Sequence, residues 1–318
     1  MVICRTLEAM RDVRRGWRSE QRAVTLIPTM GALHSGHLSL IRQAAEAGTG
    51  PRSGAGASAG PRTVVSIFVN PTQFGPEEDF DRYPRQEEQD LEMCRKEGVD
   101  AVFIPTVQEM YPRPPRFSVS IAGLNRHMCG ATRPGHFEGV CQVVAKLFHA
   151  VEPDTAWFGQ KDIQQLLILN RFTTEYNFPV RLRMGETVRE ADGLAMSSRN
   201  RYLSPEERAL APQLFTTLSE LRNRVLDMRG ASSDPAPGQV REVEEQAAST
   251  LRRIGFRTDY IGVYDAETLE PALHVSNGAL VLAAAARLGA TRLIDNLLVG
   301  AEELVGALSP TGQTGFPS

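Results

Sequence analysis

Two histidines three residues apart, His34 and His37, have the spacing in this chain that most directly suggests chemistry. They end the segment Pro28–His37 (PTMGALHSGH), which follows the apolar run Ala23–Ile27 and precedes the amphipathic run Leu38–Ala47. These runs predict a strand and a helix, so the histidines would lie at a helix entrance. A helix N-terminus carries unpaired N–H groups and a partial positive charge, which favours a bound phosphate. Imidazole donors there can stabilise charge that develops on phosphate oxygens during a reaction.

Two glycines of the same segment fit this interpretation. Gly31 and Gly36 lack a Cβ, so the backbone could approach a ligand closely. The alternative is a plain glycine turn that carries two surface histidines. The HxGH pattern alone leaves both interpretations open.

Polar side chains also follow other apolar runs. Gln73 could bind a hydroxyl or a carboxylate, although a plain proline-containing turn is the alternative. Lys161 stands near a glycine at a predicted helix start, where its point charge suits a phosphate, although lysines are usually solvated. Ser197, Ser198 and Arg199 would form a compact anion-binding cluster of hydroxyl donors and a guanidinium. The same three residues could instead be a helix cap with a surface arginine.

The elements that must position these side chains follow from the alternation of apolar runs. We predict strands at Ala23–Ile27, Thr63–Val69, Ala101–Ile104, Thr155–Phe158 and Val180–Met184, and helices at Leu38–Ala47, Gln86–Glu97, Gly139–Val151 and Asp162–Tyr176. Such alternation indicates the α/β class, with a Rossmann-like doubly wound parallel sheet. Ligands bind these sheets at the carboxyl ends of the strands.

The C-terminal part has a different pattern. Ser204–Glu207 reads as a capping box that starts a helix ending near Met228, and Gly230–Gly238 reads as a polar linker. A further helix is predicted at Val240–Ile254. Strand-like runs follow at Tyr260–Val263, Ala279–Ala286 and Arg292–Asp295. We therefore predict two domains: residues 1–186, Rossmann-like and catalytic, and residues 187–318, a smaller α+β lid domain. Residues 48–61, rich in Gly, Ala and Ser, would be a flexible insertion.

Composition narrows the class of protein. The net charge of −3 over 318 residues argues against a broad nucleic-acid-binding surface. The longest uninterrupted apolar run is Ala279–Ala286, far short of the roughly 20 residues that span a bilayer, and arginines interrupt the N-terminus where a signal peptide would be apolar. Cys4, Cys94, Cys129 and Cys141 show no CxxC spacing, so we expect reduced, buried cysteines. A cytoplasmic protein without membrane or nucleic-acid partners is expected.

Five ordered motifs together point to one family. These are PTMGALHSGH, SIFVNPTQF, RPGHFEGV, WFGQKDIQQL and ETVREADGLAMSSRNRYLS, which span roughly Leu26 to Val299. The layout resembles the HIGH/KMSKS nucleotidylyltransferase superfamily and, within it, the pantothenate synthetase (pantoate–β-alanine ligase) family. The resemblance implies that pantoate and ATP form an enzyme-bound pantoyl adenylate and pyrophosphate, and that β-alanine then releases pantothenate and AMP. It also implies Mg²⁺ and a homodimer.

The resemblance implies roles for individual residues. His37, as the usual proton donor, would act with His34, Lys161 and Arg199 as the catalytic group. Gln73 would bind pantoate and β-alanine, and Gln165 would bind pantoate. ATP would be bound by Met30, Gly31, Ala32, Leu33, His34, Ser35, Gly36, His37, Gly159, Gln160, Lys161, Asp162, Val188, Met196, Ser197, Ser198 and Arg199.

Some positions depart from the family or receive a structural interpretation. Gln160 stands where the family commonly has Glu, which puts any metal or ribose role of that residue in doubt. His136 is expected to be structural. The acidic residues Glu87, Glu88 and Asp90 are expected to form a solvated helix face, so no metal ligand is assigned.

Two rival hypotheses stay open at this point. One is a different enzyme that transfers adenylyl groups on the same fold, against which the neutral Gln73 and Gln165 argue. The other is a nucleotide-binding protein without catalysis, against which the retained histidines, Lys161 and Arg199 argue.

Overall fold

The computed structural model describes residues 1–47, 60–76, 78, 80–231, 235 and 237–300. The chain forms two compact units, each drawn from several segments. The first unit contains residues 1–121, 133–159 and 169–186, and the second contains residues 122–132, 160–168 and the chain from 187 onward. The predicted division into domains 1–186 and 187–318 stays a prediction, and residues 48–59 of the predicted insertion lie outside the described residues.

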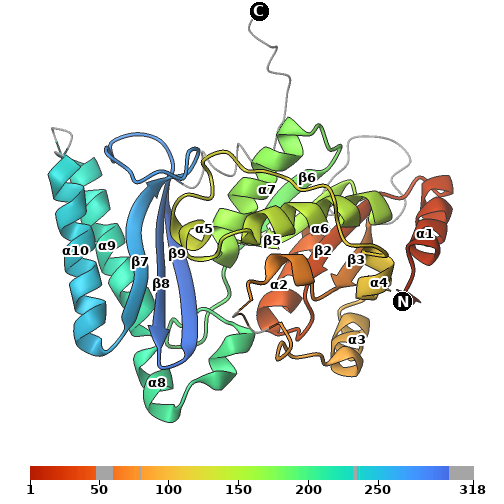
Figure 1. The fold of residues 1–318 in the computed structure, drawn as a ribbon, viewed down its shortest axis with the longest axis horizontal. Coiled ribbons are helices and arrows are strands. Elements are labelled where there is room, and N and C mark those ends of the chain that lie inside the picture. Colours follow the sequence, from red (N-terminus) through yellow and green to blue (C-terminus); the bar gives the residue numbers. More distant parts are fainter. Residues whose placement is uncertain (48–59, 77, 79, 232–234, 236, 301–318) are drawn as a thin grey trace, which may run out of the picture. The chain divides into compact units, whose positions relative to one another are not determined.

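A six-stranded parallel sheet forms the centre of the first unit (Figure 1). Its order is β1-β4-β3-β2-β5-β6, and the strands are β1 (Val2–Cys4), β2 (Val24–Thr29), β3 (Arg62–Ile67), β4 (Ala101–Phe103), β5 (Thr155–Gly159) and β6 (Arg181–Gly185). The predicted Rossmann-like class is confirmed. The chain proceeds from β2 through β3 to β4 on one side and resumes at β5 on the other side of β2. The topological switch point therefore lies between β2 and β5, where such folds bind ligands.

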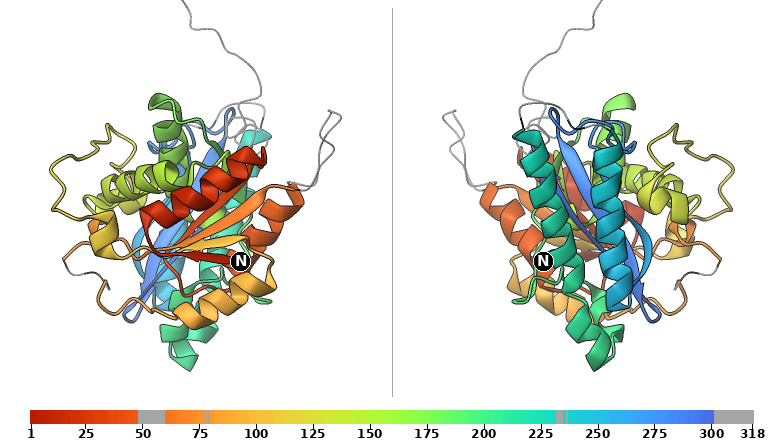
Figure 2. Two further views of the ribbon diagram at one scale, coloured as in Figure 1. Left: turned by 90° about the vertical axis from the view of Figure 1, so that its right-hand side faces the viewer. Right: turned by 90° about the vertical axis from the view of Figure 1, so that its left-hand side faces the viewer.

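Helices cover both faces of this sheet (Figure 2). They are α1 (Leu7–Ser19), α2 (Ser35–Ala47), α3 (Glu87–Lys96), α4 (Val107–Met110), α6 (His136–Val151) and part of α7 (Ile163–Glu175). Leu40, Ile41 and Leu91 of α2 and α3 pack against Val65 and Val102 of the sheet. Figure 2 shows α1 and α6 on the opposite face from α3. The apolar spacing of these helices explains why each buries one side.

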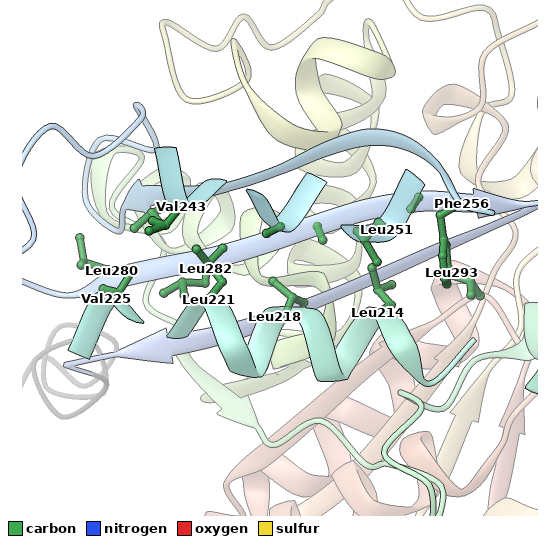
Figure 3. Packing of buried hydrophobic residues seen from close by; sticks show 14 of the residues in the cluster. Leu214, Leu218, Leu221, Val225, Val243, Leu251, Phe256, Leu280, Leu282 and Leu293 are labelled. Atoms are coloured by element: carbon green, nitrogen blue, oxygen red, sulfur yellow. The ribbon is translucent and has the colours of Figure 1, made fainter. Parts of the chain in front are cut away.

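The second unit packs two helices against a three-stranded antiparallel sheet. The strands are β7 (Arg257–Asp265), β8 (Leu280–Leu288) and β9 (Thr291–Val299), in the order β7-β8-β9. Leu218 and Leu221 of α9 (Gln213–Arg229) and Leu251 of α10 (Pro237–Ile254) face Leu282 and Leu293 of the sheet (Figure 3). The unit also contains the short helices α5 (Met128–Thr132) and α8 (Pro205–Leu210), together with the 3-10 turns η2 (Gln160–Asp162) and η3 (Ser198–Tyr202).

Several predicted boundaries were wrong for physical reasons. The helix expected from Ser204 to Met228 is two helices, because Pro212 lacks the N–H that would continue the ladder of α8. Its capping box is confirmed, since Ser204 and Glu207 satisfy each other's backbone N–H groups. Helix α10 begins at Pro237, inside the predicted linker, because proline is tolerated in a first helical turn. Neither β1 nor α1 was predicted.

The cysteines differ from one another. Cys4, Cys94 and Cys141 are buried and free, as expected, but Cys129 is only half-buried. Burial raises the pKa of Cys94 and of Cys141 to about 12. None of the described helices is both long and apolar enough to cross a membrane.

Candidate active site

The turn that follows β2 is held by a carboxylate from α3. Asp90 Oδ2 accepts a hydrogen bond from Ala32 N at 2.9 Å, and Asp90 Oδ1 accepts one from Leu33 N at 2.7 Å. Gly31 has φ +78°, and a Cβ there would lie 2.9 Å from Asp90 Oδ2, so the turn requires glycine. The expectation that Asp90 belongs to a solvated face was wrong, because its side chain is only 1% exposed.

The two histidines lie where this turn enters α2. The helix begins at Ser35 rather than Leu38, so His34 directly precedes it and His37 lies in its first turn. His34 Nδ1 accepts from Gly36 N at 3.2 Å, and His37 Nδ1 accepts from His34 N at 3.3 Å. An acceptor nitrogen carries no proton, so the proton of each neutral ring is on Nε2. The donor of each ring is therefore its Nε2–H group.

Gln73 is oriented from both ends of its amide. Its Oε1 accepts from Asn70 Nδ2 at 3.1 Å, and its Nε2 donates to Met30 Sδ at 3.2 Å. Asn70 is buried and also receives a hydrogen bond from the Tyr111 hydroxyl at 2.9 Å. The residue predicted to bind pantoate therefore contacts Met30, which begins the predicted ATP-binding segment. Both residues belong to the first unit.

A chain of polar groups supports the backbone at Gln73. His136 Nδ1 lies 2.9 Å from Gln73 O, and Arg133 NH1 lies 3.0 Å from His136 Nε2. A guanidinium only donates, so His136 Nε2 accepts and Nδ1–H donates to the carbonyl. Arg133 in turn pairs with Glu78 at 2.6 and 2.7 Å. His136 is structural in this position, in agreement with its predicted role.

The pKa of Glu78 reflects its pairing with Arg133. Burial acts to raise the pKa of Glu78, but hydrogen bonds and charge from Arg133 outweigh it, so the pKa lies below its usual value.

Lys161 lies on η2 in the second unit and is half-buried. Burial lowers the pKa of Lys161 below its usual value; Asp162 and Asp295 oppose this effect, and Arg199 reinforces it. No carboxylate among the described residues forms an ion pair with its ammonium. The charge is thus available to an anionic ligand.

The Ser-Ser-Arg segment follows a small antiparallel turn. Arg189 and Ala195 form an isolated bridge, and Met196 N donates to Val188 O at 2.9 Å. Ser197 caps η3, and its hydroxyl accepts from Arg199 N at 3.3 Å. The helix-cap interpretation of this segment is correct at Ser197, and anion binding by this segment stays a prediction.

The two glutamines of α7 have different environments. Gln164 is buried: its Oε1 accepts from Cys129 N and Gly130 N, and its Nε2 donates to Leu124 O and His127 O. The Gln165 side chain makes no hydrogen bond within the described residues and is half-buried. Gln165 is therefore the one with free hydrogen-bonding capacity for a substrate.

The predicted site residues fall into two groups. Met30–His37, Gln73 and Gly159 belong to the first unit; Gln160–Asp162, Gln165, Val188 and Met196–Arg199 belong to the second. Of the segments predicted to bind phosphate, one directly follows β2 and another directly follows β5, the two switch-point strands. Sequence reasoning missed the supporting roles of Asp90 and Asn70. Among the described residues no cluster of three or more His, Cys, Asp or Glu side chains could hold a metal ion.

Comparisons with known proteins agree on one family. A family model described as pantoate-beta-alanine ligase matches residues 2–298. The pantothenate synthetase of Paramagnetospirillum magneticum is 46% identical over 296 residues, covering 93% of this chain and 96% of that protein. The pantothenate synthetase of Thermotoga petrophila is 43% identical over 303 residues, covering 94% of this chain and 100% of that protein.

Solved structures give the same result. The crystal structure of pantothenate synthetase from Thermus thermophilus matches with a TM-score of 0.79 and 40% identity, over 93% of this chain and 99% of that one. A pantoate-beta-alanine ligase from Francisella tularensis, complexed with beta-gamma ATP and beta-alanine, matches with a TM-score of 0.71 and 27% identity, over 94% of this chain and 97% of that one.

Proposed function

Because the chain belongs to the pantoate–β-alanine ligase family, and so is a ligase that condenses pantoate with β-alanine using ATP, we propose that it activates pantoate as an enzyme-bound adenylate. A pantoate carboxylate oxygen attacks the α-phosphorus of ATP, and the bond from that phosphorus to the bridging oxygen breaks. Pyrophosphate leaves. The amine of β-alanine then attacks the acyl carbon and expels AMP, which leaves pantothenate.

The first step brings like charges together, and the proposed ATP residues suit that problem. Lys161 and Arg199 supply positive charge, and Lys161 has no ion-pair partner among the described residues. His34 and His37 supply Nε2–H donors at the N-terminus of α2, whose dipole has the same sign. Donors held in place before the reaction stabilise the added charge of the transition state without reorganisation. His37 is the proposed proton donor.

The contact of Gln73 with Met30 is the observation that carries this proposal. It holds a neutral amide beside the phosphate-binding turn, so an acid bound to the amide would lie next to the nucleotide. A neutral amide binds the carboxylate by hydrogen bonds without neutralising it, which keeps its oxygen nucleophilic. Gln165 is assigned to pantoate, and Gln73 also to β-alanine.

Protecting the adenylate from water calls for a closing element, and we assign this role to the predicted C-terminal lid domain, residues 187–318. Mg²⁺ would accompany the polyphosphate. Magnesium is commonly held by substrate phosphates, waters and one or two carboxylates rather than by a protein cage. The exposed carboxylate of Asp162, next to Lys161, fits such a role. Both oxygens of Asp90 already accept backbone N–H groups, so Asp90 does not.

We further propose that the protein forms a homodimer and acts in the cytoplasm. Residues 115–121 alternate apolar and serine side chains after Arg116, and Phe117 is 91% exposed. Within the described residues this stretch makes no backbone–backbone hydrogen bond. The Phe117 carbonyl accepts from Gln142 Nε2 at 3.1 Å, and a segment without backbone–backbone hydrogen bonds is able to pair with its own copy in a second chain.

Pyrophosphate release from ATP and Mg²⁺ tests the function directly. We expect a single turnover with pantoate alone and steady turnover, with AMP and pantothenate as products, when β-alanine is added. Release that does not depend on pantoate would contradict the proposal and favour another acid on this fold. ATP binding without any pyrophosphate release would favour a protein that only binds nucleotide.

A further inference from the structure

The turn that carries Lys161 is held by one buried side chain of β9. Asn296 Nδ2 donates to Gln160 O at 2.9 Å and to Lys161 O at 3.0 Å. Its Oδ1 accepts from Gln160 Nε2 at 3.3 Å. Asn296 is 1% exposed and these hydrogen bonds are part-buried, so removing its amide would take three hydrogen bonds from the turn.

The neighbouring residue holds the other predicted anion-binding segment. Asp295 accepts two hydrogen bonds from Arg189, at 2.6 and 2.9 Å. Arg189 also donates to Gly193 O at 3.0 Å, and its guanidinium lies 3.9 Å from the centre of the Phe215 ring. Asp295 Oδ1 further accepts from Asn296 N at 2.8 Å, which links the two side chains. The segment 188–199 is therefore anchored one residue away from the anchor of the Lys161 turn.

Resting on the proposed function, we propose that Asn296 and Asp295 are positioning residues for adenylate formation. Asn296 fixes the backbone of the Lys161 turn, and Asp295 fixes the Arg189 segment that leads to Ser197, Ser198 and Arg199. Because Asp295 and Asn296 are neighbours on β9, they together set the distance between Lys161 and the Ser-Ser-Arg donors.

Gln160 is part of this arrangement. Its amide has an N–H to donate to Asn296 Oδ1, whereas a Glu at position 160 would set a carboxylate against that oxygen. Gln160 thus adds a third hydrogen bond to the side chain of Asn296. It also keeps a negative charge away from the carbonyls that Asn296 must reach.

The structural test uses the variants Asn296→Ala and Asp295→Asn, with Thr291→Val as a matched control at a buried polar position of the same strand. The chain has three lysines, Lys96, Lys146 and Lys161, so ¹³C-dimethylation gives few NMR signals, and each can be titrated. The charged or titratable groups acting on Lys161 are Asp162, Arg199, Asp295 and Cys129.

The two variants are expected to shift the pKa of Lys161 in opposite directions. Asn296→Ala frees the turn and admits water, so the pKa rises toward its ordinary value. Asp295→Asn removes a favourable negative charge, so the pKa falls further. The signals of Lys96 and Lys146, and all signals of Thr291→Val, stay unchanged. This readout does not depend on ligase activity, so it can fail or succeed apart from the proposed function.

The kinetic test separates positioning from general stability. In folded Asn296→Ala we expect kcat for adenylate formation to fall by about 10- to 100-fold, the effect of a displacement near 1 Å, while KM for β-alanine changes less than about two-fold. Asp295→Asn should raise KM for ATP. An unchanged Lys161 pKa together with an unchanged kcat in folded Asn296→Ala would overturn the proposal. So would a loss of melting temperature with no kinetic change.

Discussion

The proton positions on His34 and His37 follow from the backbone. Each Nδ1 accepts an N–H of the turn or of the first helical residues, which leaves Nε2 to donate. A histidine at either position that lost its backbone partner could present the wrong nitrogen to a phosphate. The HxGH spacing therefore orients two donors and fixes their tautomers as well.

Replacing His37 by Ala tests the role of this donor. Adenylate formation should fall by roughly 10² or more, as expected when a preorganised donor to a developing charge is removed. Pantoate-dependent pyrophosphate release in a single turnover measures the effect. The exposed His274 provides the control, because His274→Ala should leave the rate unchanged. Near-normal release in His37→Ala would exclude His37 as the proton donor.

At the residue level, the sequence motifs locate the candidate site residues, which stay predictions, but they do not reveal the side chains that support them. Gln73, Lys161 and Ser197 lie close to residues that mark turns and helix starts in the sequence. Asp90 lies 58 residues beyond Ala32, and acidic residues at a helix start are usually solvated. One signal was present: Asp90 and Cys94 are four residues apart and share the buried face of α3.

At the scale of elements, α6 and η1 (Pro71–Gln73) meet backbone to backbone. A Cβ on Gly139 would lie 2.2 Å from Thr72 O, and Gly139 O also accepts from Asn70 Nδ2 at 3.1 Å. Gly139, the second glycine of the RPGHFEGV motif, thus allows the close approach by which the helix supports Gln73.

Gly139→Ala should force the helix and the turn apart. We expect destabilisation of about 1–3 kcal/mol from overpacking and a raised KM for pantoate relative to ATP, measured by denaturant unfolding and steady-state kinetics. Gly16→Ala is the control, since that glycine lies inside α1 with nothing within 4 Å of an added Cβ. It should stabilise the protein by about 0.5–1 kcal/mol. Equal behaviour of the two variants would show that the close approach is unimportant.

The pair of Glu78 and Arg133 predicts a dependence of stability on pH. The folded-state pKa of Glu78 lies below its unfolded value. The pair therefore contributes stability above the unfolded pKa, and this contribution is lost as pH falls through the folded pKa. Glu78→Gln should lower the free energy of unfolding at pH 7 by about 1 kcal/mol and have a smaller effect at pH 3. Urea unfolding at both pH values measures it; a constant difference would show that Glu78 does not titrate as described.

Elements were predictable where the local pattern decided the structure. Strands β2 to β6 are short apolar runs, so their positions followed from the sequence to within a few residues. Helix α2 starts three residues earlier than predicted, because Ser35 and Gly36 are polar or small and give no periodic signal. The short edge strand β1 is formed by pairing with β4, about 100 residues away, which no local pattern reveals.

For the whole molecule, the stretch 115–121, in which Phe117 is exposed and Val119 is half-buried, predicts how two chains associate. Phe117→Asp and Val119→Asp should shift the protein from twice the chain mass of 34.9 kDa toward a single mass in sedimentation at micromolar concentration. Leu273→Asp, at an exposed apolar residue of the second unit, should leave the mass unchanged. A dimer that persists in both of the first variants would place the contact elsewhere.

Each unit is built from several separate segments of the chain, and this affects how the protein tolerates recombination between relatives. The apolar cluster of the second unit lies entirely between Leu194 and Val299, whereas residues 122–132 and 160–168 join that unit from the N-terminal half. In chimaeras that exchange the C-terminal half between relatives, the apolar core of the second unit would come complete from one parent. Lys161 and Asn296 would then come from different parents. A crossover near Thr187 should therefore yield folded hybrids whose activity depends on whether the incoming strand brings the same Asp-Asn pair. A substitution at Asp295 or Asn296 would therefore change the activity through a turn that is encoded in the other half of the chain.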